Sequence, residues 1–163
     1  MKKIAIFASG GGSNFKAIYE KIISRDIPAE ISIVVSNNPN CGAINFAKKN
    51  ILPTFIVNKT RFPDLETRNM MLKQNLLKVD VNLICLAGYM KMIPTNIVDH
   101  FKNCILNIHP ALLPNFGGKG FYGMKIHEAV IQSNATESGA TIHFVDNKYD
   151  HGPIIAQQKV MIL

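Results

Sequence analysis

The sequence lacks the features that mark membrane and secreted proteins. In its 163 residues, no run of apolar residues is long enough to span a bilayer. The opening Met1-Lys2-Lys3 leads directly into a short apolar segment, without the longer apolar region and small-residue cleavage site of a secretory signal. We therefore expect one cytoplasmic domain without a membrane partner, large enough to bury a core of its own.

Cysteine is scarce, and its spacing excludes the common structural uses. Cys41, Cys85 and Cys104 are odd in number and form no Cys-x-x-Cys pair, which favours a reducing compartment. The five histidines include no His-Glu-x-x-His or comparable ligand spacing, and no Gly-x-Ser-x-Gly elbow indicates a serine hydrolase. The sequence therefore predicts neither a metal site nor a serine nucleophile.

Acidic residues are outnumbered, since 18 Lys and Arg against 11 Asp and Glu give a formal net charge of +7. The basic residues are scattered and form no basic run or RNA-binding signature, so we expect no nucleic-acid partner. Small anionic substrates such as phosphates and carboxylates explain the excess more economically, although charge alone does not choose between the two.

Strands and helices are expected to alternate along the chain. Apolar segments predict strands at 3–8, 31–35, 54–57, 81–86, 139–145 and 154–163, and helical spacing predicts helices at 15–22, 43–49, 64–78 and 124–132. The near-continuous apolar run at 81–86 is typical of a strand that is covered on both faces. The alternation predicts an α/β fold, Rossmann-like, with a mostly parallel sheet and helices on both faces.

The first strand ends at a glycine-rich loop, residues 9–14 (Ser-Gly-Gly-Gly-Ser-Asn), that leads into a helix. Backbone N–H groups in such a loop can approach an anion at the positive end of the helix. The dinucleotide pattern would require glycine at Phe15, and the P-loop would require Gly-Lys-Ser/Thr. The next strand ends in Ser36-Asn37-Asn38, without a carboxylate for an NAD ribose. We interpret the loop as a cradle for a phosphate monoester; a tight turn is the alternative.

A second segment, residues 107–114 (Asn-Ile-His-Pro-Ala-Leu-Leu-Pro), reads as a strand end that runs into a rigid loop. Pro110 favours extended backbone at His109. Asn107 and His109 are two residues apart and would emerge on one face of a strand. There an amide and an imidazole can donate hydrogen bonds to one developing negative charge. The alternative is a core asparagine and histidine that are satisfied by backbone groups.

These segments are expected to meet, because ligands of parallel sheets bind beyond the carboxyl ends of the strands. The glycine loop, residues 88–93 and the strand end at His109 all fall on that edge. Tyr89 and the methionines that follow it would line a flat apolar slot; the alternative is that they belong to the core.

In combination and in order, four motifs resemble the phosphoribosylglycinamide formyltransferases, the folate-dependent enzymes of purine synthesis. The motifs are residues 9–14, 86–90 (Leu-Ala-Gly-Tyr-Met), 107–114 and 150–153 (Asp-His-Gly-Pro). The resemblance covers essentially the whole chain. It implies the formyltransferase fold and transfer of the formyl group of 10-formyltetrahydrofolate, as co-substrate, to glycinamide ribonucleotide without a metal. It leaves a homodimer open.

The resemblance also implies roles for individual residues. The catalytic group would be Asn107, His109 and Asp150, with His143 in support, and ionised Asp150 would favour the imidazolium form of His109. The ribonucleotide would be bound by Gly12, Ser13, Asn14 and Gly88. The folate would be bound by Arg68, Met90, Lys91, Met92, Ile93, Asn107 and Asp146. Residues 1–100 would form the nucleotide-binding half of a single domain, and residues 101–163 the catalytic and folate-binding half.

One departure from the family pattern and several alternatives accompany this resemblance. The family continues past the apolar end at residues 160–163, so we expect its C-terminal segment to be lacking here. Formyltetrahydrofolate hydrolase and methionyl-tRNA formyltransferase share the core, but they would carry an added regulatory or tRNA-binding domain. A catalytically silent nucleotide-binding module is the alternative outside the enzymes.

Overall fold

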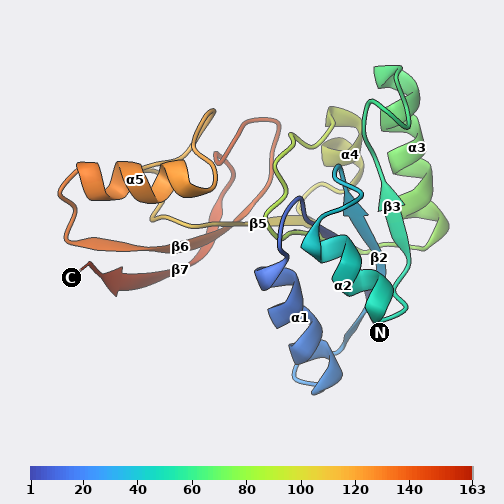
Figure 1. Ribbon diagram of the computed structural model, residues 1–163, viewed down its shortest axis with the longest axis horizontal. Coiled ribbons are helices and arrows are strands. Elements are labelled where there is room, and N and C mark those ends of the chain that lie inside the picture. Colours follow the sequence, from blue (N-terminus) through green and yellow to red (C-terminus); the bar gives the residue numbers. More distant parts are fainter. Residues whose placement is uncertain (163) are drawn as a thin grey trace.

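The computed structural model describes residues 1–162, which form an open sheet with flanking helices (Figure 1). The elements in chain order are β1 (Lys2–Phe7), α1 (Ser13–Ile23), β2 (Ala29–Ser36), α2 (Gly42–Lys49), β3 (Thr54–Ile56), α3 (Leu65–Lys78), β4 (Leu83–Leu86), α4 (Thr95–His100), β5 (Ile105–His109), α5 (Met124–Gln132), β6 (Glu137–Phe144) and β7 (Ile154–Met161). The sheet has the order β3-β2-β1-β4-β5-β6-β7, parallel from β3 to β5 and antiparallel at β6 and β7. The predicted mostly parallel α/β sheet is confirmed.

Helices cover both faces of the parallel part of the sheet. Phe15 of α1 and Ile44 of α2 pack in the core on one face. Leu76 of α3 and Ile97 of α4 pack in the core on the other. Because β1 and β4 lie between these two layers, their side chains are apolar on both faces, as their continuous apolar sequence predicts.

Two helices show how far local sequence signals reach. Asp64 caps α3, since its carboxylate accepts a hydrogen bond from the Thr67 N–H at 2.7 Å. The helix predicted at 64–78 therefore begins at Leu65, one residue later than predicted. By contrast, α4 was not predicted. This helix follows Pro94 and has only six residues, and a segment of that length is too short to show a helical period of apolar residues.

The elements after β5 extend away from the rest of the molecule, to the left in Figure 1. There α5 buries Ile126 and Val130 against Ala111, while every residue of β7 is exposed. The predicted last strand ends at Met161, and Leu163 lies outside the described residues. Within residues 1–162, no helix has the length and apolar character needed to cross a membrane.

Two adjacent leucines of α3 provide a matched test of this core. Leu76 is fully buried, whereas Leu77 is 42% exposed. We expect Leu76→Ala to lower the free energy of unfolding by about 2–5 kcal/mol, because it leaves a cavity between α3 and the sheet. Leu77→Ala should change it by no more than about 0.5 kcal/mol. Urea denaturation measures both, and equal losses would contradict the placement of α3.

Candidate active site

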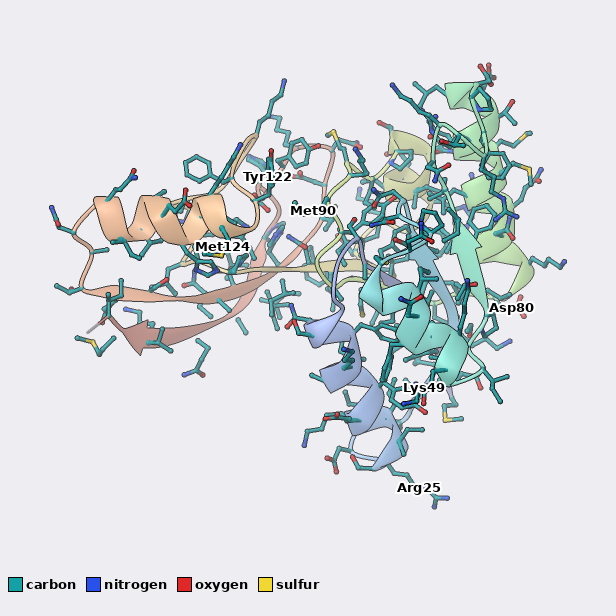
Figure 2. All side chains as sticks on the ribbon, viewed as in Figure 1. Arg25, Lys49, Asp80, Met90, Tyr122 and Met124 are labelled. Atoms are coloured by element: carbon teal, nitrogen blue, oxygen red, sulfur yellow. The ribbon has the colours of Figure 1, made fainter. Side chains whose placement is uncertain are left out.

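A cavity of about 670 Å³ lies at the carboxyl-end edge of the parallel strands. It is lined by residues from the glycine loop, the ends of β4 and β5, the β6–β7 connection and the start of α5. Met90 and Tyr122, both labelled in Figure 2, belong to this lining. The volume falls in the range of small-molecule sites.

The pairing of β5 with β6 determines which polar side chains meet in the cavity. The two strands are antiparallel, and their register places Asn107 opposite His143 and His109 opposite Thr141. Asn107 Nδ2 lies 3.0 Å from His143 Nε2. His143 Nδ1–H donates to the Phe144 carbonyl at 2.8 Å, so the neutral ring presents Nε2 to Asn107 as an acceptor.

The β6–β7 connection brings Asp150 to the same place. Its Oδ1 lies 3.4 Å from His109 Nδ1, 3.6 Å from His143 Nε2 and 3.4 Å from Asn107 Nδ2. Its Oδ2 accepts a hydrogen bond from the Gly118 N–H at 3.0 Å. The two imidazoles are 4% and 2% exposed and the carboxylate 10%. The predicted catalytic residues and His143 therefore converge on one nearly buried carboxylate.

The backbone of the β6–β7 connection explains the residue types of the Asp-x-Gly-Pro motif. The Phe144 N–H donates to the Pro153 carbonyl at 2.9 Å, which closes the hairpin just after Gly152. A Cβ atom at Gly152 would collide with the Phe144 carbonyl oxygen, so only glycine fits. Asp150 has a φ of +51°, a left-handed conformation that aspartate tolerates better than most residues.

Backbone contacts orient the His109 ring and its loop. Its Nε2–H donates to the Phe116 carbonyl at 2.8 Å, which leaves Nδ1 facing Asp150. The following loop is braced by Thr141, whose buried hydroxyl donates to the Ala111 carbonyl at 2.7 Å and accepts from the Leu113 N–H at 3.0 Å. Sequence reasoning missed these braces, because their partners lie about thirty residues apart.

The electrostatics of the cluster favour a carboxylate beside an imidazolium. Burial by itself raises the pKa of Asp150, but His143, the Gly118 N–H and the charge of His109 together hold it below its ordinary value of 3.8. Burial by itself lowers the pKa of His143, yet Asp150 and the Phe144 carbonyl raise it above its ordinary value of 6.5.

These two shifts set a pH window for stability. The His143 contribution is fully present below pH 6.5 and is lost as pH rises through its raised folded-state pKa. The Asp150 contribution is fully present above pH 3.8 and is lost as pH falls through its lowered one. Both contributions are therefore complete only between these two values, at mildly acidic pH.

The glycine loop leads into the cavity at Asn14, which belongs to the lining, while Gly12 and Ser13 come immediately before it. Gly12 is the N-cap residue before α1 and has a φ of +77°, and a Cβ there would lie 3.0 Å from the Cβ of Ala43. Among the described residues, no side chain caps the helix, so its first N–H groups remain available to a ligand.

Most of the residues predicted to bind folate also line the cavity: Met90, Lys91, Met92, Ile93, Asn107 and Asp146. Gly88, which is predicted to bind the ribonucleotide, belongs to the same lining. Arg68 is different, since it lies on α3 outside the lining and its Nη1 donates to the Phe62 carbonyl at 3.0 Å. A ligand contact by Arg68 stays a prediction. In the part of the chain that the structure describes, no group of three or more His, Cys, Asp or Glu side chains is arranged to hold a metal ion.

The fold is that of a known family. The formyl transferase family matches residues 2–163, so the chain belongs to it. Phosphoribosylglycinamide formyltransferase from Haemophilus influenzae is 36% identical over 99% of this chain and 74% of its own length. The crystal structure of phosphoribosylglycinamide formyltransferase from Bacillus halodurans superposes with a TM-score of 0.90 at 33% identity, over 99% of this chain and 81% of that one.

A chloroplastic phosphoribosylglycinamide formyltransferase from Vigna unguiculata has a higher identity, 44% over 99% of this chain. The present chain spans only 52% of that protein and 56% of the corresponding protein of Arabidopsis thaliana. It thus matches about half the length of these plant relatives.

The cluster predicts a measurable coupling between Asp150 and His143. Asp150→Asn keeps the shape of the side chain and removes its charge, so the pKa of His143 should fall, because burial then acts on the ring without its counter-charge. Titration of the His143 ring signals by NMR in both proteins measures this shift. The signals of His100, on α4 outside the cavity lining, are the internal reference. An unchanged His143 titration would contradict the pairing.

Proposed function

We propose that this chain transfers the formyl group of 10-formyltetrahydrofolate to the primary amine of glycinamide ribonucleotide. The observation that carries the proposal is the convergence of Asn107, His109 and Asp150 in a cavity whose lining also includes Asn14 of the glycine loop. Membership of the formyl transferase family and the names of the relatives support the same reaction.

The reaction requires a hydrogen-bond donor to the developing oxyanion and a group that transfers a proton. The lone pair of the amine attacks the formyl carbon, and the carbonyl oxygen gains negative charge. The bond from that carbon to the folate nitrogen then breaks, while one proton leaves the amine and one reaches the departing nitrogen. The products are the formylated ribonucleotide and tetrahydrofolate, so neither a metal nor an oxidant takes part in the balance.

The Asn107 amide suits the oxyanion because its Nδ2 carries two hydrogens. One of them points to Nε2 of the neutral His143 ring, 3.0 Å away. The other makes only a long contact with Asp150 Oδ1, at 3.4 Å, and it can instead donate to an oxyanion that develops in the cavity lined by Asn107.

His109 and Asp150 suit the proton transfer. Because the Phe116 carbonyl holds Nε2–H, Nδ1 is the ring atom that exchanges a proton, and it faces the Asp150 carboxylate. An imidazolium at His109 would place a positive charge beside the oxyanion. Asp150 would stabilise that imidazolium and then relay a proton between the amine and the departing nitrogen.

The two substrates would approach from different segments. The ribonucleotide phosphate would lie at Gly12, Ser13 and Asn14, where helix N–H groups remain available, with Gly88 nearby. The folate would lie along residues 90–93 and Asp146, with Lys91 near its carboxylates. The division into residues 1–100 and 101–163, the contact by Arg68, the cytoplasmic location and a homodimer stay predictions.

The direct test supplies both substrates and follows the formylated ribonucleotide by mass spectrometry. We expect product from the wild type and a kcat lowered about 10²–10³-fold in Asn107→Ala, which loses an oxyanion donor. Asn45→Ala, at an exposed position of α2 outside the cavity lining, is the matched control and should keep its rate. Release of formate without ribonucleotide would instead indicate a hydrolase, and binding without turnover a silent module.

The phosphate loop has its own test. In Gly12→Ala, the left-handed backbone and the contact with Ala43 force the loop to shift, so KM for the ribonucleotide should rise about tenfold while KM for the formyl donor stays the same. Asn45→Ala, at an exposed position of α2 outside the loop and the cavity lining, is the control and should leave both KM values unchanged. A similar rise in both KM values would indicate general misfolding rather than a phosphate contact.

A further inference from the structure

Ser9 has contacts that the proposed reaction does not use. It follows β1, is 9% exposed and does not line the cavity. Its N–H donates to the Gly88 carbonyl at 3.0 Å, and its Oγ accepts from the Met90 N–H at 2.8 Å. One residue therefore holds both ends of the turn at 88–90, whose first residue has a φ of +83°.

Asn37 orients the Ser9 hydroxyl. Ser9 has a single O–H, which donates to Asn37 Oδ1 at 2.5 Å, and this leaves an oxygen lone pair for the Met90 N–H. Asn37 is itself held in place, since its backbone carbonyl oxygen accepts a hydrogen bond from Asn58 Nδ2 at 3.0 Å. The ends of β1, β2 and β3 are thereby connected to the turn after β4.

We propose that Ser9 is a positioning residue for the formyl-donor side of the cavity, with Asn37 as the group that orients it. This rests on the proposed function, in which residues 90–93 contact the folate. Ser9 is also the first residue of the glycine loop at 9–14, whose later residues are proposed to bind the phosphate, so it sets the position of one substrate wall relative to the other. Its hydroxyl acts on the donor through the Tyr89–Met90 peptide and touches no substrate.

The turn at 88–90 has a second contact with the core, so the loss of Ser9 can affect the position of the turn without unfolding it. The Tyr89 ring packs edge-on against Phe7 with centroids 5.2 Å apart, and it lies against the buried core. Loss of the Ser9 hydroxyl should therefore leave the turn in place but free the Met90 N–H and the peptide that carries it. A donor left without its partner is the costly outcome of such a deletion.

The test compares Ser9→Ala with Ser32→Ala. Ser32 Oγ is buried and has no hydrogen-bond partner within residues 1–162, so removing it deletes a serine hydroxyl without breaking a contact. In Ser9→Ala, hydrogen exchange of the Met90 amide should accelerate about tenfold or more, and KM for 10-formyltetrahydrofolate should rise about tenfold. KM for glycinamide ribonucleotide and kcat should change less than twofold. Ser32→Ala should match the wild type.

Substitutions at Asn37 complete the test. Asn37→Asp keeps an oxygen acceptor for Ser9 and should retain the wild-type KM, whereas Asn37→Ala should reproduce the effect of Ser9→Ala. The double variant should be no worse than either single one, because both remove one coupled contact. Unchanged exchange at Met90 in Ser9→Ala would overturn the proposal, as would an equal rise in both KM values. If the wild type transfers no formyl group, the proposed function fails, while Met90 exchange still decides whether Ser9 holds the turn.

Discussion

The site depends on the pairing of β5, which is parallel to β4 on one side and antiparallel to β6 on the other. The antiparallel side places Asn107 opposite His143, and the hairpin that follows β6 returns Asp150 to the same point. A slip of one residue in this register would turn Asn107 to the other face of the sheet. The buried core beneath β5 therefore also determines the geometry of the polar cluster.

The second constraint is electrostatic. A carboxylate that is only 10% exposed would be costly without partners, and here Asp150 has two imidazoles, an amide and a backbone N–H. Such a cluster contributes little to stability compared with an apolar core, and it is therefore better evidence for function. Its groups shift one another's pKa values in opposite directions, toward a negative carboxylate and a positive ring.

The residues of the site come partly from strands and partly from the loops at the edge of the sheet. The sheet supplies Asn107, His109 and His143, while the connections at its edge supply the glycine loop, the turn after β4 and Asp150. These connections are held by hydrogen bonds between distant segments, such as Thr141 with the loop after β5. The cavity therefore keeps its shape although much of its wall is loop.

Local patterns in the sequence were sufficient for most elements, because apolar periodicity and caps act between neighbouring residues. They predicted the parallel strands, the helix capped by Asp64, and Asn107 and His109 on one face of a strand. Asp150 is assigned a role only through resemblance to a family, and nothing local connects it or His143 to Asn107 across 43 and 36 residues. Only the tertiary structure decided that they meet, that Arg68 lies outside the cavity, and that Ser9 holds the turn at 88–90. The register of the strands and the path of the β6–β7 connection depend on packing between residues far apart in the sequence, and no local pattern encodes such packing.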